Sequence, residues 1–145
     1  MGTQQASAIW NGTLKEGNGT FELPKGNYTG DFTFASRFET GDGTNPEELV
    51  GAALASCFSM FLSALLTKSD YQPERIQTTA SVTLDSTDNG PTISSIALET
   101  KATVPNLSET DFNNFVAEAK AKCPISKLYT GTSISVNAKL LSLAS

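Results

Sequence analysis

Residues 45–66 read NPEELVGAALASCFSMFLSALL, and this stretch decides the fold. It begins as a helix should, because Asn45 is a good N-cap and the proline after it suits the first helical position. Glu48 stands three residues after the cap, as in a capping box, where its charge suits the positive end of the helix dipole. No charged residue follows between positions 49 and 66. The stretch predicts a long helix that is apolar on every side, with Cys57 at its middle.

A helix that is apolar on every side is either buried or spans a membrane. This run is at the short end of membrane-spanning lengths, contains Gly51 and three serines, and lacks a basic flank. We therefore expect a buried central helix and no membrane partner.

Composition narrows the chemistry. The 145 residues suit one domain spanning positions 1–145, and the net charge of −5 disfavours nucleic acid as a partner. The absence of histidine excludes Ser-His-Asp and Cys-His catalysis and histidine-ligated metals, and two cysteines cannot form a four-cysteine zinc site. The remaining reactive groups are Cys57, Cys123, carboxylates, two arginines and lysines.

The first ten residues, MGTQQASAIW, contain no apolar segment of the kind found in a secretory signal peptide. We therefore expect a cytoplasmic protein, in which thiols stay reduced unless redox chemistry is their task.

Alternation and turn residues predict the other elements. The segment 31–38 alternates so that Phe32, Phe34 and Phe38 share one face of a strand and Arg37 lies on the other. A second helix is capped by Ser108 and ends at Cys123, before a proline. The expected strands are 7–15, 19–23, 31–38, a hairpin of 76–84 and 93–104 turning at Asn89-Gly90, and 133–141.

The order βββ-α-ββ-α-β predicts an α+β fold with a mainly antiparallel sheet around the central helix. One small sheet covers only one side of a helix that is apolar all round. The simplest cover for the other side is a second copy of the chain, so we expect a two-fold homodimer.

Two cysteines 66 positions apart form no CxxC motif and by themselves suit inert core residues. If they are redox-active, neither ionises unaided, because burial raises the pKa of Cys57 and a helix C-terminus opposes a thiolate at Cys123. A cation must then be supplied by Arg37 or Arg75, and Arg37, just before the loop into the central helix, is the better candidate.

Four segments carry a resemblance: Arg37-Phe38-Glu39, GTNPEEL at 43–49, GAALASCFSM at 51–60 and AKAKCPIS at 119–126. Together they resemble the OsmC/Ohr family of thiol peroxidases, and Trp10-x-Gly12 and Gly17-x-Gly19 are closer to its OsmC branch (osmotically inducible protein C).

The resemblance implies an OsmC-like fold that forms a two-fold intertwined dimer, and it also implies an activity and a site. Cys57 corresponds to the peroxidatic cysteine, Cys123 to the resolving cysteine, Glu47 to the carboxylate that orients the active-site arginine, and Arg37 to the arginine that stabilises the thiolate. The implied reaction is reduction of organic hydroperoxides, and more weakly of hydrogen peroxide, through a Cys57 sulfenic acid and a Cys57–Cys123 disulfide. An external dithiol, such as a lipoylated protein, would reduce the disulfide, with no metal, haem or flavin.

The sequence leaves two questions open: how Glu47 and Arg37 reach a cysteine, and whether the protein is a peroxidase at all. Glu47 and Cys57 are ten residues apart, about 15 Å along a straight helix, so the helix start is unwound or the site is shared across a dimer. We favour delivery of Arg37 or Glu47 by the partner chain. The alternatives to a peroxidase are a non-catalytic dimeric domain that binds a hydrophobic small molecule and, less well supported, an exported protein with a structural disulfide.

Overall fold

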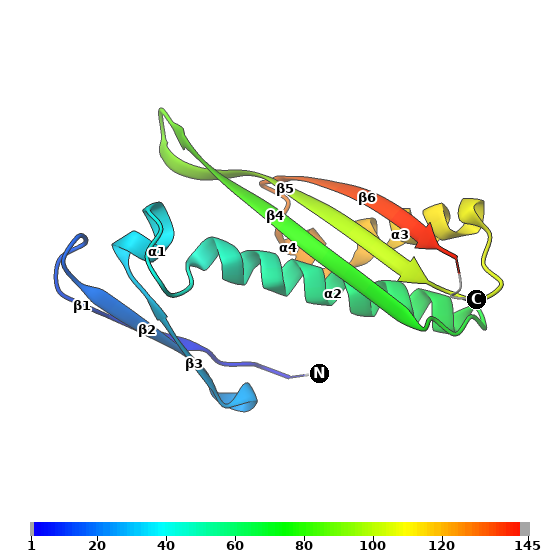
Figure 1. Cartoon of the computed structure of the whole chain (residues 1–145), viewed down its shortest axis with the longest axis horizontal. Helices are drawn as coiled ribbons and strands as arrows, with labels where there is room; N and C mark the ends of the chain where they lie inside the picture. The colour runs from blue at the N-terminus through cyan, green and yellow to red at the C-terminus, as the bar shows by residue number, and fades with distance from the viewer. Residues whose placement is uncertain (1, 143–145) are drawn as a thin grey trace. The chain divides into compact units, whose positions relative to one another are not determined.

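The computed structural model describes residues 2–142 (Figure 1). The chain divides into two compact units, with the boundary between Leu49 and Val50. We call them the N-terminal unit and the C-terminal unit.

The N-terminal unit contains a three-stranded antiparallel sheet in the order β1-β2-β3, which confirms the predicted meander. The first strand is shorter than expected, because β1 ends at Asn11. Gly19 in β2 has a packing role: a Cβ at this position would lie 2.6 Å from the Phe32 ring and 2.7 Å from the Trp10 ring. These two rings pack across the glycine at a centroid distance of 5.5 Å. The strands are β1 (Ser7–Asn11), β2 (Asn18–Leu23) and β3 (Tyr28–Phe32), with a short 3-10 turn, η1, at Pro24–Gly26.

The predicted strand over 31–38 is wrong, because only its first two residues belong to a strand. β3 ends at Phe32, and Phe34–Phe38 forms a short helix, α1. The cause is a capping box: the Thr33 hydroxyl accepts from the Ser36 backbone N–H, and the Ser36 hydroxyl accepts from the Thr33 N–H. Local hydrogen bonds of this kind compete with a sheet ladder and here override the alternating pattern.

The central helix, α2 (Pro46–Lys68), is confirmed as one continuous element. The Asn45 side chain caps it by accepting from the Glu48 backbone N–H at 2.8 Å. Glu48 does not complete a capping box in the expected way, since its carboxylate accepts from the Thr44 hydroxyl.

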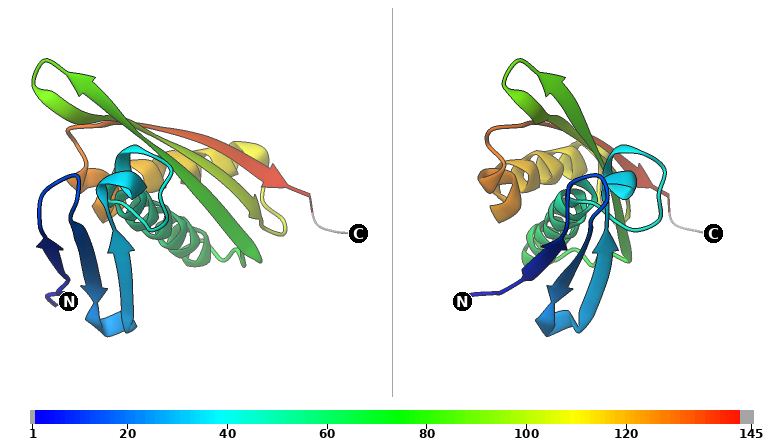
Figure 2. Two further views of the ribbon diagram at one scale, coloured as in Figure 1. Left: turned by 60° about the vertical axis from the view of Figure 1, so that its left-hand side comes forward. Right: turned by 90° about the vertical axis from the view of Figure 1, so that its left-hand side faces the viewer.

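The C-terminal unit contains a second three-stranded sheet in the order β4-β5-β6. β4 and β5 form the predicted hairpin, while β5 and β6 are parallel, because α3 and α4 carry the chain back between them. Figure 2 shows α2 and α3 on the same face of this sheet. The elements are β4 (Arg75–Thr87), β5 (Gly90–Thr103), α3 (Glu109–Lys122), α4 (Pro124–Leu128) and β6 (Ser133–Leu141). Ser108 caps α3 as predicted, by accepting from the Asp111 N–H.

Within one chain, only one row of α2 is fully buried. Its members recur every four residues and pack against β5 and α3: Leu54, Phe58, Leu62 and Leu66. The facing residues alternate along β5, as a strand with one covered side requires: Ile96, Leu98, Thr100 and Ala102. The expectation of burial on every side is therefore met on one side only, and Met60 is 75% exposed.

A chain of hydroxyl groups crosses the same layer. The Ser59 hydroxyl on α2 lies 2.7 Å from that of Thr78 on β4, which contacts the hydroxyl of Thr100 on β5. Thr78 and Thr100 are directly opposite in the sheet register. Each of these three hydroxyls therefore has a hydrogen-bond partner, as buried hydroxyls require.

Two short sheets with intervening helices confirm the α+β class. By length and composition alone, α2 could also cross a membrane. Its buried row under the β4-β5-β6 sheet is instead what a core helix shows.

The buried row predicts where stability resides. Leu62→Ala should lower the free energy of unfolding by about 2–5 kcal/mol, because it leaves a cavity in a packed core. Leu128→Ala, the same change at a side chain that is 70% exposed, should cost less than about 0.5 kcal/mol. Urea unfolding at a fixed protein concentration measures both, and equal losses would contradict this assignment of the core.

Candidate active site

The structure brings the two cysteines together within the C-terminal unit. Both thiols are free, and their sulfur atoms lie 2.7 Å apart although the residues are 66 positions apart in the chain. Cys57 lies in the middle of α2, and Cys123 lies at the junction where α3 ends and α4 begins. Cys57 is partly exposed, whereas Cys123 is completely buried. The two sulfurs thus meet at the edge of the core, with only one of them accessible.

The surroundings of Cys57 oppose its ionisation. Burial is the largest cause that raises the pKa of the Cys57 thiol, and the adjacent Cys123 sulfur raises it further. The backbone N–H of Ile125 acts in the opposite direction, as a hydrogen-bond donor to the sulfur that lowers this pKa. The prediction that burial raises the pKa of Cys57 is confirmed.

The sequence analysis missed Ile125. It lies in the first turn of α4, directly after Pro124, where backbone N–H groups have no partner within the helix, so its N–H is available to Cys57. The signal in the sequence is the Cys123-Pro124 step, which predicts the end of α3 and is also well suited to start another helix.

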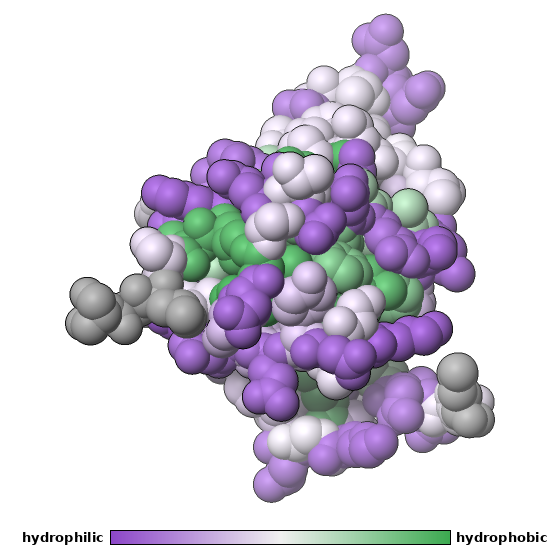
Figure 3. Space-filling view, turned by 90° about the vertical axis from the view of Figure 1, so that its right-hand side faces the viewer, coloured by the Kyte–Doolittle hydropathy of each residue, from purple (hydrophilic) through white to green (hydrophobic). Residues whose placement is uncertain are grey.

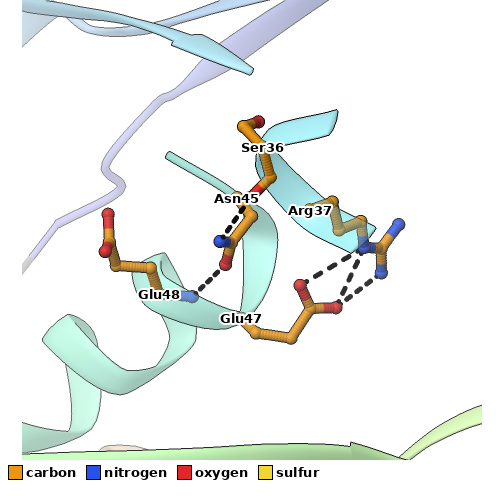
Figure 4. A network of polar contacts seen from close by, with 5 residues as sticks. All are labelled: Ser36, Arg37, Asn45, Glu47 and Glu48. Atoms are coloured by element: carbon orange, nitrogen blue, oxygen red, sulfur yellow. Dashed lines mark hydrogen bonds and ion pairs between the residues drawn. The ribbon is translucent and has the colours of Figure 1, made fainter. Parts of the chain in front are cut away.

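A separate cluster in the N-terminal unit holds Arg37 and Glu47. The guanidinium Nη2 donates to Glu47 Oε1 at 2.6 Å, and Nε donates to Oε1 and Oε2 at 3.1 and 3.2 Å (Figure 4). Glu47 is almost fully buried, while the side chain of Arg37 is 37% exposed. Among the described residues, Nη1 of Arg37 has no hydrogen-bond partner. One edge of the guanidinium is therefore fixed and another remains available to an anion.

Arg37 lies on α1 and not at a strand end. Its guanidinium carbon is 5.2 Å from the centre of the Phe38 ring, so the prediction that Arg37 faces away from the aromatic residues is wrong. The loop into α2 is tied to α1, because the Asn45 amide donates to the Ser36 carbonyl at 3.1 Å (Figure 4). The capping box of α1 and the cap of α2 together hold Arg37 against Glu47. A pocket of this unit places Arg37 beside apolar side chains: Trp10, Leu14, Phe32, Phe34, Phe38 and Pro46.

Two other side chains weighed from the sequence lie elsewhere. Arg75, the second candidate cation, is exposed on β4 and donates to Gln77. Phe58, which follows Cys57 in α2, is fully buried in the core, whereas Met60 and Phe61 remain at least partly exposed.

Comparison with known proteins supports the family resemblance found in the sequence. The family model described as OsmC-like protein matches residues 39–139. The chain belongs to the OsmC-like family. It is 42% identical over 126 residues to "Peroxiredoxin OsmC" of Escherichia coli, covering 86% of this chain and 88% of that protein. It is 37% identical over 94 residues to "Organic hydroperoxide resistance protein-like 2" of Staphylococcus epidermidis, covering 63% of each. The predicted resemblance, including its OsmC branch, is confirmed.

Solved structures of OsmC-like proteins share the fold. The OsmC-like protein of Mycoplasma pneumoniae has a TM-score of 0.77 at 18% identity, covering 97% of this chain and 98% of that one. An organic hydroperoxide resistance protein of Legionella pneumophila has a TM-score of 0.69 at 22% identity over similar shares, 97% and 98%. The predicted OsmC-like fold is confirmed.

The sulfur geometry predicts easy closure of a bridge. Treatment of the reduced protein with diamide, a general thiol oxidant, should remove both free thiols and form a disulfide within one chain, because the atoms need move less than about 1 Å to reach the S–S bond length. Thiol counting and non-reducing electrophoresis measure this. A single remaining thiol per chain, or bridges only between chains, would contradict the pairing.

Proposed function

We propose that this OsmC-like protein is a thiol-dependent organic hydroperoxide reductase. The observation that carries the proposal is the contact of two free sulfurs, one accessible and one buried. A thiolate attacks the distal oxygen of the peroxide, the O–O bond breaks, an alcohol leaves, and the sulfur becomes a sulfenic acid. The second thiol condenses with it, releasing water and forming a disulfide. The names of the relatives, a peroxiredoxin and organic hydroperoxide resistance proteins, support this reaction class.

The two cysteines take different roles because their access differs. Cys57 is the peroxidatic residue, since an oxidant must reach it and it is partly exposed. Cys123 is the resolving residue, since it is buried yet touches Cys57. An external dithiol, of which a lipoylated protein is one form, then reduces the disulfide by exchange. The cycle uses thiol chemistry alone and calls on no metal, haem or flavin.

Cys57 needs a cation, because burial and the second sulfur raise its pKa. Arg37 is our candidate, with Glu47 fixing one edge of its guanidinium and the other edge available to the thiolate. Support comes from the ion pair itself, since a buried carboxylate that holds an arginine in one orientation preorganises its charge.

We propose that Arg37 serves Cys57 of the other protomer in a homodimer. α2 is unbroken from Pro46 to Lys68, so Glu47 and Cys57 of one chain are separated by about 15 Å of helix. An unwound helix start, the other explanation open to the sequence, has no support in α2. This separation supports delivery of Arg37, held by Glu47, to the thiolate of the other protomer.

Exposed apolar surface supports the same dimer. Met60 on α2 is 75% exposed. Separately, apolar side chains gather on the face in Figure 3, with polar side chains around them. Apolar areas of this kind mark sites of association. A second copy would supply the cover that the row of α2 opposite the core lacks.

Organic hydroperoxides are the proposed substrates, with hydrogen peroxide reduced more weakly. The pocket that holds Arg37 is lined by aromatic and aliphatic side chains, which suit a hydrophobic tail beside the peroxide group. We propose a cytoplasmic location, where dithiol reductants are maintained. The alternative of a non-catalytic domain that binds a hydrophobic molecule is not favoured by the comparisons.

Variants of the two cysteines test the activity. Cys57→Ser should abolish consumption of cumene hydroperoxide, because no nucleophile remains. Cys123→Ser should allow one turnover and leave a sulfenic acid that reacts with dimedone, because nothing condenses with it. The wild type should consume cumene hydroperoxide faster than hydrogen peroxide. Activity retained without Cys57, or thiols that cumene hydroperoxide leaves untouched, would refute the proposal and favour the binding domain.

Mixed dimers test the source of the arginine. Arg37→Ala alone should lower activity about a hundredfold, as loss of a preorganised charge does, and Cys57→Ser alone should be inactive. A dimer that combines one chain of each variant, isolated with two affinity tags, has one complete site only if Arg37 acts across the dimer. We expect this mixed dimer to recover half of the wild-type activity. If it is as inactive as its parents, Arg37 acts within its own chain.

A further inference from the structure

Reduction of the disulfide poses an electrostatic problem that the proposed function leaves open. The external thiolate must attack the Cys57 sulfur, because Cys123 is completely buried. The S–S bond then breaks and its electron pair passes to the Cys123 sulfur. A thiolate thus appears on a side chain with no solvent contact, where negative charge is costly unless a hydrogen-bond donor reaches it.

When both cysteines are thiols, the buried hydroxyl of Ser126 has no hydrogen-bond partner, and the packing gives no reason for it. Ser126 is 92% buried, as its exposed fraction is 8%, and its hydroxyl is the one buried side-chain polar atom of the described residues that lacks a hydrogen-bond partner. A buried hydroxyl with no partner costs about 1–3 kcal/mol, so its presence calls for a reason.

The backbone explains why the hydroxyl is free. Cys123 occupies the N-cap position of α4, and Ser126 is the third residue of that helix. In a capping box the side chain at this third position bonds to the N-cap backbone N–H, so the two residues lie on the same side of the helix start. Here the Cys123 N–H already donates to the Ala119 carbonyl, at 2.9 Å. Ser126 therefore lies in the first turn of α4, three residues after Cys123, with its usual backbone partner taken.

We propose that Ser126 is the hydrogen-bond donor to the Cys123 thiolate that leaves when the disulfide is reduced. A rotation about its χ1 angle turns the hydroxyl toward the sulfur as charge develops there. The hydroxyl keeps its proton throughout. The reductant's second thiol then attacks the reductant's own sulfur in the mixed disulfide. The bond to Cys57 breaks, the Cys57 thiolate is regenerated, the reductant becomes a disulfide, and the proton of its second thiol passes to Cys123. The proposal rests on the proposed function for its cycle but concerns only the reductive half.

Ser126→Ala tests this with readouts that a purely structural residue would not separate. The disulfide is first formed with diamide, so the measurement does not depend on peroxidase activity. Reduction by dithiothreitol should be about tenfold slower than in the wild type, which corresponds to the loss of one hydrogen bond to a developing charge. Single-turnover oxidation of Cys57 by cumene hydroperoxide should be unchanged. The reduced protein should be as stable as the wild type or more so, because the unpartnered hydroxyl is gone.

Two further variants sharpen the comparison. Ser126→Thr keeps a hydroxyl and should restore most of the reduction rate. Ser59→Ala removes a hydroxyl from α2 that already has a partner in Thr78, so it should lower stability without slowing reduction of the disulfide. The proposal is overturned if Ser126→Ala reduces at the wild-type rate, if it slows oxidation and reduction alike, or if Ser59→Ala slows reduction equally. A failure of cumene hydroperoxide to oxidise the wild type, with the slower reduction still present, would count against the proposed function alone.

Discussion

The contact between two sulfur atoms at the edge of a packed core is the feature on which the rest of the structure depends. A sulfur partly accessible on α2 and another fully buried at the α3–α4 junction lie 2.7 Å apart. Neither helix could hold this position alone. α2 is fixed by one fully buried apolar row under the β4-β5-β6 sheet, and α3 by Phe112, Val116 and Ala119 in the same core. The core thus brings together two groups that are distant in sequence, and a pair of thiols becomes capable of forming a bond.

The position of the two sulfurs at the edge of the core affects the charge on sulfur in both the oxidative and the reductive half of the proposed cycle. Burial raises the pKa of the Cys57 thiol, so attack on a peroxide needs positive charge from elsewhere. The ion pair of Arg37 with Glu47 is a suitable source, since it leaves part of the guanidinium free. In the return half, the charge forms on Cys123 instead, and we assign its stabilisation to the unpartnered hydroxyl of Ser126. In our account, burial of the two sulfurs is the reason that both the Arg37 charge and the Ser126 hydroxyl are needed.

Much of the fold could be predicted from the sequence, because its strongest signals are local. The N-cap at Asn45, the uncharged run after it, and the cap at Ser108 each act within one helix, and both long helices lie where expected. The strand predicted over 31–38 is wrong for an equally local reason. Its alternation of phenylalanines is a strand pattern, but Thr33 and Ser36 form reciprocal hydrogen bonds that start a helix.

The site could be predicted only in part. The residues Cys57, Cys123, Arg37 and Glu47 were recognised from the family resemblance, while their distances were not readable from spacing. Ile125 was missed because the prediction from the Cys123-Pro124 step covers only the end of α3. Ser126 was missed because a hydroxyl without a partner carries no sequence signature. Which face of α2 is buried within one chain was also not readable, because every face of that helix is apolar. Only packing against a particular sheet distinguishes the row of Phe58 from that of Met60.

The most direct test of the central claim is the intact mass of the reduced protein after one equivalent of cumene hydroperoxide. Our account predicts a loss of two hydrogen atoms per chain, with peptide mapping locating one bridge between the segments that hold Cys57 and Cys123. A stable gain of oxygen at Cys57, or an unchanged mass, would contradict it, because two adjacent sulfurs that do not join on oxidation cannot be a peroxidatic and resolving pair.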